Sequence, residues 1–153
     1  DMLNNAGTIL YGRTTYQLME VFWPTVVKNP TGDEHMDDFA NAIENVSKVL
    51  FSRTVKSVTW DNARLATQNL KDEVTALKQQ PGNDILVGSP SLIAELTKLN
   101  LIDVWQLCVH PVIAGQGLPL FKGITERIVF KLLKTQTFKT SGHVVFYYAR
   151  SNE

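Results

Sequence analysis

The sequence has a single cysteine, Cys108, among its 153 residues. One thiol cannot form an intramolecular disulfide, so a disulfide-stapled secreted scaffold is excluded. No apolar run reaches the roughly 20 residues of a membrane span, and no signal peptide is visible. These absences predict a cytoplasmic protein with no membrane partner. The apolar residues around Cys108 predict that its thiol is buried and structural.

The sequence also lacks an excess of charge of either sign. Lysine and arginine together number 15, as do aspartate and glutamate, and no long run of like charge occurs. A nucleic-acid partner is therefore not expected. The three histidines, His35, His110 and His143, have no second ligand at metal-binding spacing, so no metal site is expected.

Hydrophobic residues make up 44% of the chain, which is enough for one packed domain spanning residues 1–153. Strand and helix patterns alternate through the first two-thirds, whereas the last third contains several strand-like runs in succession. The alternation predicts parallel strands covered by helices, and the succession predicts antiparallel strands. The chain is therefore predicted to be an α/β domain.

The first strand-to-helix junction carries a glycine, a cation and two hydroxyls: Gly12, Arg13, Thr14 and Thr15. A helix N-terminus presents unpaired N–H groups and a partial positive charge, which suit an anion. Glycine and threonine also occur at such junctions without any ligand. These residues alone leave the phosphate-binding and structural interpretations open. A helix is predicted over residues 14–21, and a turn-rich loop with two prolines follows it.

Polar residues follow two further predicted strands. Ser52 and Arg53 come after one apolar run, and Gly88, Ser89 and Ser91 come after another. Ligands of open α/β sheets bind outside the carboxyl ends of parallel strands, so these residues could line one edge with the first junction. Neither a G-x-G-x-x-G nor a G-x-x-x-x-G-K-[ST] motif occurs, which excludes a Rossmann fingerprint and a P-loop.

Five segments carry a resemblance to a known family: GRTTY, VLFSRT, ILVGSPSLIAEL, LIDVWQLCVHPVIAGQGLPLF and FYYAR. In order and spacing they resemble the dihydrofolate-reductase-like superfamily. The closer branch is the reductase domain of the bifunctional riboflavin-biosynthesis deaminase-reductase, with its single-domain bacterial relatives. The most specific element is P-V-I-x-G-x-G-x-x-L-F at Pro111 to Phe121. The chain departs from the family at Ser89-Pro90, where a second glycine is common.

The resemblance implies a three-layer fold with a mixed central sheet of about eight strands, flanked by helices, and NADPH bound across the strand ends. Arg13, Thr14 and Thr15 would then hold phosphates at a helix start, with Gly12 before them. Ser52 and Arg53 would meet the 2'-phosphate of the adenosine. The stretch from Gly88 to Leu92, including Ser89 and Ser91, would lie under the pyrophosphate.

The resemblance further implies a first strand, beside the nicotinamide, that would lie ahead of Asp1. We therefore expect that the N-terminal strand of the family is missing from this sequence. The residues that would supply a proton in the family are expected there too, so no catalytic residue is assigned.

The family likeness predicts an NADPH-dependent reductase that transfers a hydride to a heterocyclic substrate. The activity it most resembles is that of 5-amino-6-(5-phosphoribosylamino)uracil reductase. Two alternatives stay open: reduction of a pterin, as in dihydrofolate reductase, and a nucleotide-binding homodimer without turnover. Trp23, after the first helix, could line the pocket for a flat substrate or could pack in the core.

The last strand is apolar on both of its alternating faces. Val144, Phe146 and Tyr148 share one face, while Val145, Tyr147 and Ala149 share the other. A solvent-facing strand normally alternates with polar residues. A homodimer that covers this region is therefore expected.

Overall fold

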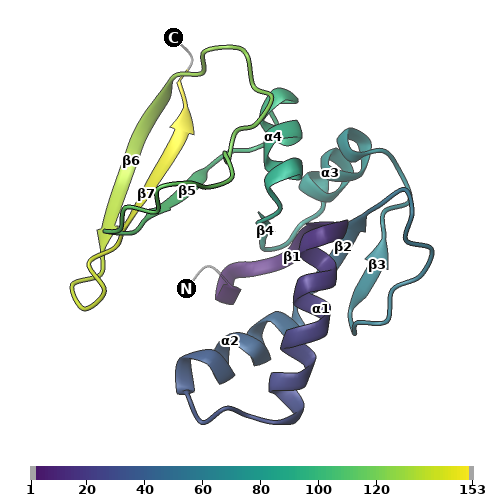
Figure 1. Cartoon of the computed structure of the whole chain (residues 1–153). Helices are drawn as coiled ribbons and strands as arrows, with labels where there is room; N and C mark the ends of the chain where they lie inside the picture. The colour runs from purple at the N-terminus through teal and green to yellow at the C-terminus, as the bar shows by residue number, and fades with distance from the viewer. Residues whose placement is uncertain (1–2, 152–153) are drawn as a thin grey trace.

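The computed structural model describes residues 3–151, in which the strands form two separate sheets (Figure 1). After one 3-10 turn, η1 (Leu3–Asn5), the first sheet has four parallel strands in the order β3-β2-β1-β4. Its strands are β1 (Ala6–Gly12), β2 (Ser47–Phe51), β3 (Ala63–Leu65) and β4 (Asp84–Val87).

Four helices cover this parallel sheet: α1 (Arg13–Lys28), α2 (Glu34–Asn45), α3 (Leu70–Gln79) and α4 (Pro90–Lys98). Successive strand side chains point to opposite faces, which divides the core into two clusters. Ile9 and Tyr11 of β1 pack with residues of α1 and α2, while Leu10 packs with residues of α3 and α4. The result is a three-layer α/β arrangement, as the sequence predicted.

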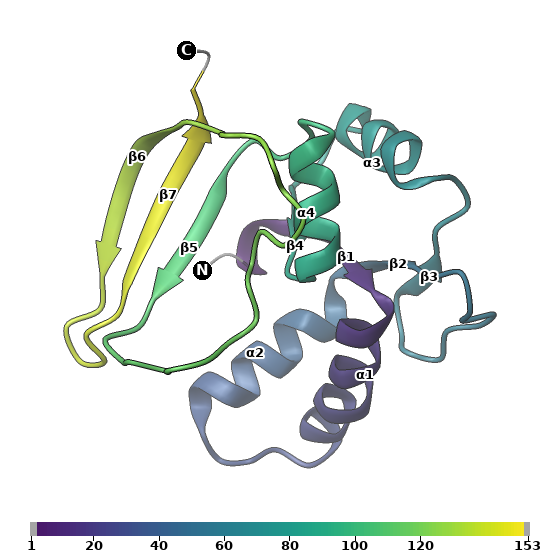
Figure 2. The same cartoon turned by 45° about the horizontal axis from the view of Figure 1, so that its top comes forward.

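The second sheet is antiparallel and has the order β5-β7-β6. Its strands are β5 (Trp105–Val109), β6 (Phe130–Thr137) and β7 (Val144–Arg150), and Figures 1 and 2 show it to one side of the parallel sheet. The antiparallel C-terminal strands are confirmed. The single mixed sheet is not formed, because within residues 3–151 no strand pairs with the outer edges of β4 and β5. The strand expected ahead of Asp1 lies outside the described residues and stays a prediction.

Helix α1 is twice as long as the sequence predicted. The stretch from Phe22 to Lys28 is helical although Pro24 lies inside it, where a loop was expected. Proline removes one hydrogen bond and normally costs about 3 kcal/mol in a helix interior. Packing outweighs this cost, because Trp23 contacts Phe39 of α2 and Val26 is 5% exposed.

Glu73 of α3 is a buried carboxylate that stabilises the loop before α3 by hydrogen bonding. It accepts hydrogen bonds from the backbone amides of Thr67 and Gln68, both at 3.0 Å, and from Arg64 at 2.6 Å. Burial raises the pKa of Glu73, but these hydrogen bonds and the arginine charge together outweigh burial and lower the pKa. The ionised form of Glu73 therefore stabilises the fold.

We expect Glu73→Gln to lower the free energy of unfolding at neutral pH by about 2 kcal/mol, because it removes the charge-assisted bond. Since the pKa is lower in the folded state than its ordinary value of 4.5, this contribution is complete above that value and is lost as the pH falls below it. Urea unfolding at neutral and acidic pH should show the difference between wild type and variant shrinking in acid. Glu126→Gln, at an exposed position, is the matched control. A difference that does not depend on pH would contradict the role of ionised Glu73.

Candidate functional site

The carboxyl ends of β2, β1 and β4 meet at one edge of the parallel sheet. Gly12 at the end of β1 is paired with Phe51 at the end of β2. On the other side of β1, Leu10 is paired with Val87, the last residue of β4. Neighbouring strands lie about 4.8 Å apart, so the residues that follow these strands are close in space. The three polar segments singled out in the sequence therefore lie at a common edge.

A buried hydrogen bond ties the ends of β1 and β4 together. The backbone N–H of Gly12 donates to Ser89 Oγ at 2.9 Å, and Ser89 is 1% exposed. A Cβ atom on Gly12 would lie 3.3 Å from Ser91 Oγ, so a glycine allows the starts of α1 and α4 to approach closely. The Ser89 hydroxyl therefore has a structural role, because it accepts the hydrogen bond that joins the ends of β1 and β4.

Helices α1 and α4 begin side by side at this edge, as Figures 1 and 2 both show. Gly12, the N-cap of α1, has no side chain, and the side chain of Ser89, the N-cap of α4, accepts no hydrogen bond from the first turn of its helix. Pro90 is the first residue of α4, a position whose N–H has no partner within the helix in any case. The first-turn amides of both helices therefore point at the edge and can bind an anion.

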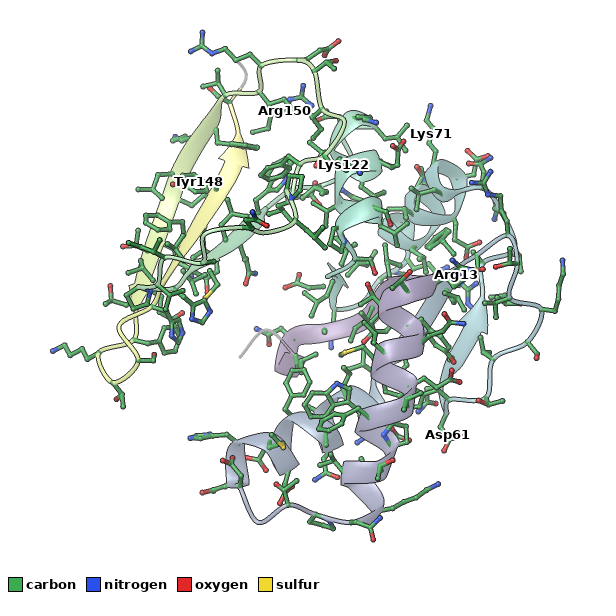
Figure 3. All side chains as sticks on the ribbon, in the orientation of Figure 1. Arg13, Asp61, Lys71, Lys122, Tyr148 and Arg150 are labelled. Atoms are coloured by element: carbon green, nitrogen blue, oxygen red, sulfur yellow. The ribbon has the colours of Figure 1, made fainter. Side chains whose placement is uncertain are left out.

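Two arginines add formal positive charge to the edge. Arg13 is the first residue of α1, is exposed, and lies at the end of that helix nearest α4 (Figure 3). Arg53 is exposed and lies in the turn after β2. Ser52 Oγ accepts hydrogen bonds from the amides of Thr54 and Val55, at 3.2 and 3.0 Å, and so fixes that turn. The cations and helix dipoles together make the edge electropositive.

The backbone at Gly88 borders open space. A Cβ atom built on Gly88 would meet no heavy atom within 4 Å, although the residue lies between β4 and α4. Uncovered backbone of this kind lets a ligand contact the main chain directly. The residues present therefore fit a phosphate-containing cofactor: two helix starts, two arginines and an uncovered glycine.

Not every predicted residue offers its side chain to this edge. Thr14 is exposed and Thr15 half-buried, whereas Leu92 is 8% exposed and packs in the core with Leu10. Only the backbone amide of Leu92 is available to a ligand. Trp23 lies ten residues along α1, about 15 Å from its start, where it packs on Phe39 with ring centroids 4.5 Å apart.

An aromatic cluster lies next to the end of β1. The rings of Tyr11, Tyr16 and Trp60 lie about 6 Å apart, measured between centroids. The Tyr16 hydroxyl donates to Glu20 at 3.0 Å, and burial together with this bond raises the pKa of Tyr16 to about 12. Both tyrosines stay neutral at physiological pH, so the cluster anchors the end of β1 rather than supplying charge.

The prediction for Cys108 was wrong. Its thiol is exposed on β5, because the strand belongs to a sheet that is covered much less than the parallel one. Its sulfur lies 3.5 Å from His110 Nε2, and the His110 ring stacks on His143 with centroids 5.1 Å apart. Within residues 3–151 no cluster of three His, Cys, Asp or Glu side chains is arranged to bind a metal ion.

The hydrogen bond between Gly12 and Ser89, which ties two of the three strand ends together, was not predicted from the sequence. The available signal was positional, since both residues directly follow predicted strands that could be neighbours. The family resemblance placed Ser52 and Ser89 against cofactor phosphates, whereas in the structure the hydroxyls of both residues accept hydrogen bonds from backbone amides.

No helix in the described part of the chain is both long and apolar enough to cross a membrane.

Comparison with known proteins gives a consistent result. Residues 1–144 match the family model for the RibD C-terminal domain. The uncharacterized protein YyaP of Bacillus subtilis is 38% identical over 149 residues, which cover 97% of this chain and 76% of that protein. The family and the closer branch expected from the sequence are thereby confirmed.

Solved structures support the same fold. A putative riboflavin biosynthesis protein from Shewanella sp. PV-4 superposes with a TM-score of 0.73 and 18% identity, covering 99% of this chain and 77% of that one. The dihydrofolate reductase of Enterococcus faecalis, solved with NADP(H), superposes with a TM-score of 0.60 and 13% identity, covering 97% and 77%. At these identities the likeness concerns the fold alone.

Proposed function

This chain belongs to the RibD C-terminal domain family, and from that premise we propose that it is an NADPH-dependent reductase acting on a heterocyclic substrate. The family and the dihydrofolate-reductase-like fold support a reductase-type function. The choice of cofactor rests on the geometry of the strand edge, and the choice of substrate rests on the family.

One observation carries the cofactor proposal. The uncapped starts of α1 and α4 lie side by side at the strand ends, next to the open backbone of Gly88. A pyrophosphate needs several N–H donors that converge on one place, which two adjacent helix starts supply. That the E. faecalis reductase was solved with NADP(H) adds support from a protein of the same fold.

Different residues would hold different parts of the cofactor. The first-turn amides of α1 and α4 would bind the phosphates, with the Thr14 and Ser91 hydroxyls beside them. Arg13 and Arg53 would bind the 2'-phosphate that distinguishes NADPH from NADH. When bound, NADPH supplies the hydride, and the chain's task is to hold the nicotinamide ring against the substrate.

For the substrate we favour the ribosylamino-pyrimidine of 5-amino-6-(5-phosphoribosylamino)uracil reductase, because the chain falls in the RibD reductase family. The hydride would then reduce the sugar carbon of the glycosylamine to a ribityl chain. Substrate is expected where the nicotinamide end of the cofactor lies. No residue of the described chain is assigned as the proton donor.

A glycine pair tests the nucleotide site. Gly88 and Gly117 each border open space, and neither has a positive φ, so an added Cβ atom meets no neighbour at either position. We expect Gly88→Val to weaken NADPH binding at least roughly tenfold, because the added side chain occupies the place of the cofactor. Gly117→Val should bind as wild type. Titration of NADPH, followed by tryptophan fluorescence and calorimetry, measures both dissociation constants.

The outcomes separate the candidate functions. Binding of NADPH together with its oxidation by the pyrimidine substrate supports the proposed reductase. Oxidation by dihydrofolate instead indicates pterin reduction, and binding without oxidation by either indicates a nucleotide-binding protein without turnover. If NADPH fails to bind, or Gly88→Val binds it as tightly as wild type, the site is wrongly placed.

A further inference from the structure

A groove lies at the C-terminal end of α4, away from the strand edge at Gly12. Its larger part is a cavity of about 280 Å³, lined by the last turn of α4, by the chain between β5 and β6, and by Arg150 at the end of β7. Figures 1 and 2 both show the chain between β5 and β6 running beside α4. Pockets for drug-sized ligands begin at about 300 Å³, so this cavity suits a smaller molecule.

The groove continues into an apolar end. A second cavity of about 190 Å³ adjoins the first, because both are lined by Ile124 and Ile128. It adds the side chains of Phe121 and Phe130. On Phe130 packs Trp105, which is 4% exposed, with ring centroids 4.6 Å apart. This end can therefore bury a hydrocarbon side chain of a ligand.

Several polar groups of the groove already have partners within the chain. The Thr97 hydroxyl donates to the carbonyl oxygen of Ile93 at 2.7 Å. The Lys98 ammonium donates to Glu95 Oε1 at 2.8 Å, which offsets its charge. A Cβ atom on Gly123 would lie 3.8 Å from this ammonium, so Lys98 stands against the chain between β5 and β6. Thr97 and Lys98 therefore form the wall of the groove.

Two opposite charges remain at the groove. One guanidinium nitrogen of Arg150 donates to Asn100 Oδ1 at 3.0 Å, which holds the side chain in place and leaves its other N–H donors free (Figure 3). The Glu126 carboxylate is exposed, and within residues 3–151 it forms neither an ion pair nor a hydrogen bond. The carbonyl groups at the end of α4 add partial negative charge. The groove thus offers one place for an anion and one for a cation.

We propose that this groove binds a free α-amino acid with an apolar side chain. The ligand carboxylate accepts hydrogen bonds from Arg150, because a guanidinium presents parallel N–H donors that match a carboxylate. The ligand ammonium lies against Glu126 and the end of α4, and the side chain fills the apolar end. A phosphate is a poorer ligand here, since Glu126 repels its negative charge.

The groove is separate from the proposed nucleotide site. Helix α4 begins at the strand edge with Pro90, and Lys98 lies eight residues later, about 12 Å along the helix. Binding of an amino acid can therefore be measured without NADPH. Failure of this proposal leaves the nucleotide site standing, and failure of the nucleotide site leaves this proposal standing.

Calorimetry with L-phenylalanine and two analogues tests the proposal. Phenylpropanoate keeps the ring and the carboxylate but lacks the ammonium. Phenethylamine keeps the ring and the ammonium but lacks the carboxylate. We expect each analogue to bind at least roughly tenfold more weakly than phenylalanine, because each leaves one charge of the groove without a partner. Equal affinities for all three ligands would show that only the ring is bound and would overturn the proposal.

Two variants that remove charge assign the two groups. Glu126→Gln should weaken phenylalanine binding at least about tenfold without weakening phenylpropanoate binding. Arg150→Gln should weaken phenylalanine binding equally without weakening phenethylamine binding, and glutamine can still donate to Asn100. Arg127→Gln is the matched control, because Arg127 is exposed in the same chain segment but does not line the groove. Circular dichroism checks that each variant is folded.

Three further results would contradict an amino-acid site. Phenylalanine and leucine that both fail to bind at millimolar concentration overturn the proposal. So does binding that both glutamine variants at the groove leave unchanged, because the ligand then lies elsewhere. An equal loss in Arg127→Gln would show a general effect of charge instead of a site.

Discussion

Replacement of Lys48 by methionine should destabilise the protein by about 3 kcal/mol. Lys48 of β2 is 1% exposed, and its ammonium donates to the carbonyl oxygens of Glu44, Val46 and Asp61 at 3.0 to 3.1 Å. It also lies 4.5 Å from the centre of the Trp60 ring. Methionine keeps most of the stem but removes the donor from all three carbonyls.

Two effects oppose each other at this position. Burial lowers the pKa of Lys48, and the charges of Glu44 and Asp61 offset this only in part, so the buried charge itself is costly. Exchanging a buried ion pair for apolar residues can be neutral for that reason. Here the partners are backbone carbonyls, which no substitution removes. The Glu44 carbonyl keeps its hydrogen bond from Asn62 Nδ2, but the buried carbonyl of Val46 would lose its bond to the ammonium. The loss of the hydrogen bonds therefore decides the sign.

The free energy of unfolding in urea measures this effect. Lys71→Met is the matched control, since the side chain of Lys71 extends into solvent from α3 (Figure 3). It should change stability by no more than about 0.5 kcal/mol. Equal stabilities for the two methionine variants would show that the ammonium of Lys48 contributes nothing.

Replacement of Arg53 by alanine should weaken NADPH binding by roughly 10- to 100-fold and leave NADH binding almost unchanged. A charge-assisted bond to phosphate contributes about 1.5 to 3 kcal/mol, and only NADPH carries the 2'-phosphate. Arg13→Ala should show the same selectivity, because both arginines follow the paired strand ends of β1 and β2.

Dissociation constants for both cofactors measure this selectivity. Arg127→Ala is the matched control, because Arg127 is exposed in the loop before β6 and far from these strand ends in sequence and sheet. Equal losses for NADPH and NADH would mean that the arginines act on a part common to both cofactors. No loss for either would remove both residues from the site.

The strand edge was predictable because local and global signals agree there. Gly12, Arg13 and the residues after β2 and β4 are each marked by a change from apolar to polar sequence. Because parallel strands end at one edge of a sheet, these residues are expected to lie close together even when no contacts are known. The family resemblance added the three-layer fold, and the comparisons confirm the family and the fold class.

Features that depend on packing could not be read from the sequence. Pro24 suggests a loop by its local preference, and only the contact between Trp23 and α2 keeps the helix intact. Cys108 has apolar neighbours in sequence, yet strand alternation and the open sheet leave it exposed. In the sequence, Lys48 has the features of a surface cation. Only the folded chain brings the carbonyl oxygens of Glu44, Val46 and Asp61 to its ammonium.

The buried hydrogen bond between the Gly12 N–H and Ser89 Oγ has a consequence for hydrogen exchange at the strand edge. Since Ser89 is 1% exposed, the Gly12 amide can exchange with solvent only when the ends of β1 and β4 separate. The exchange rate of this one amide therefore reports how often the starts of α1 and α4 part, and a ligand bound across both helix starts should slow it.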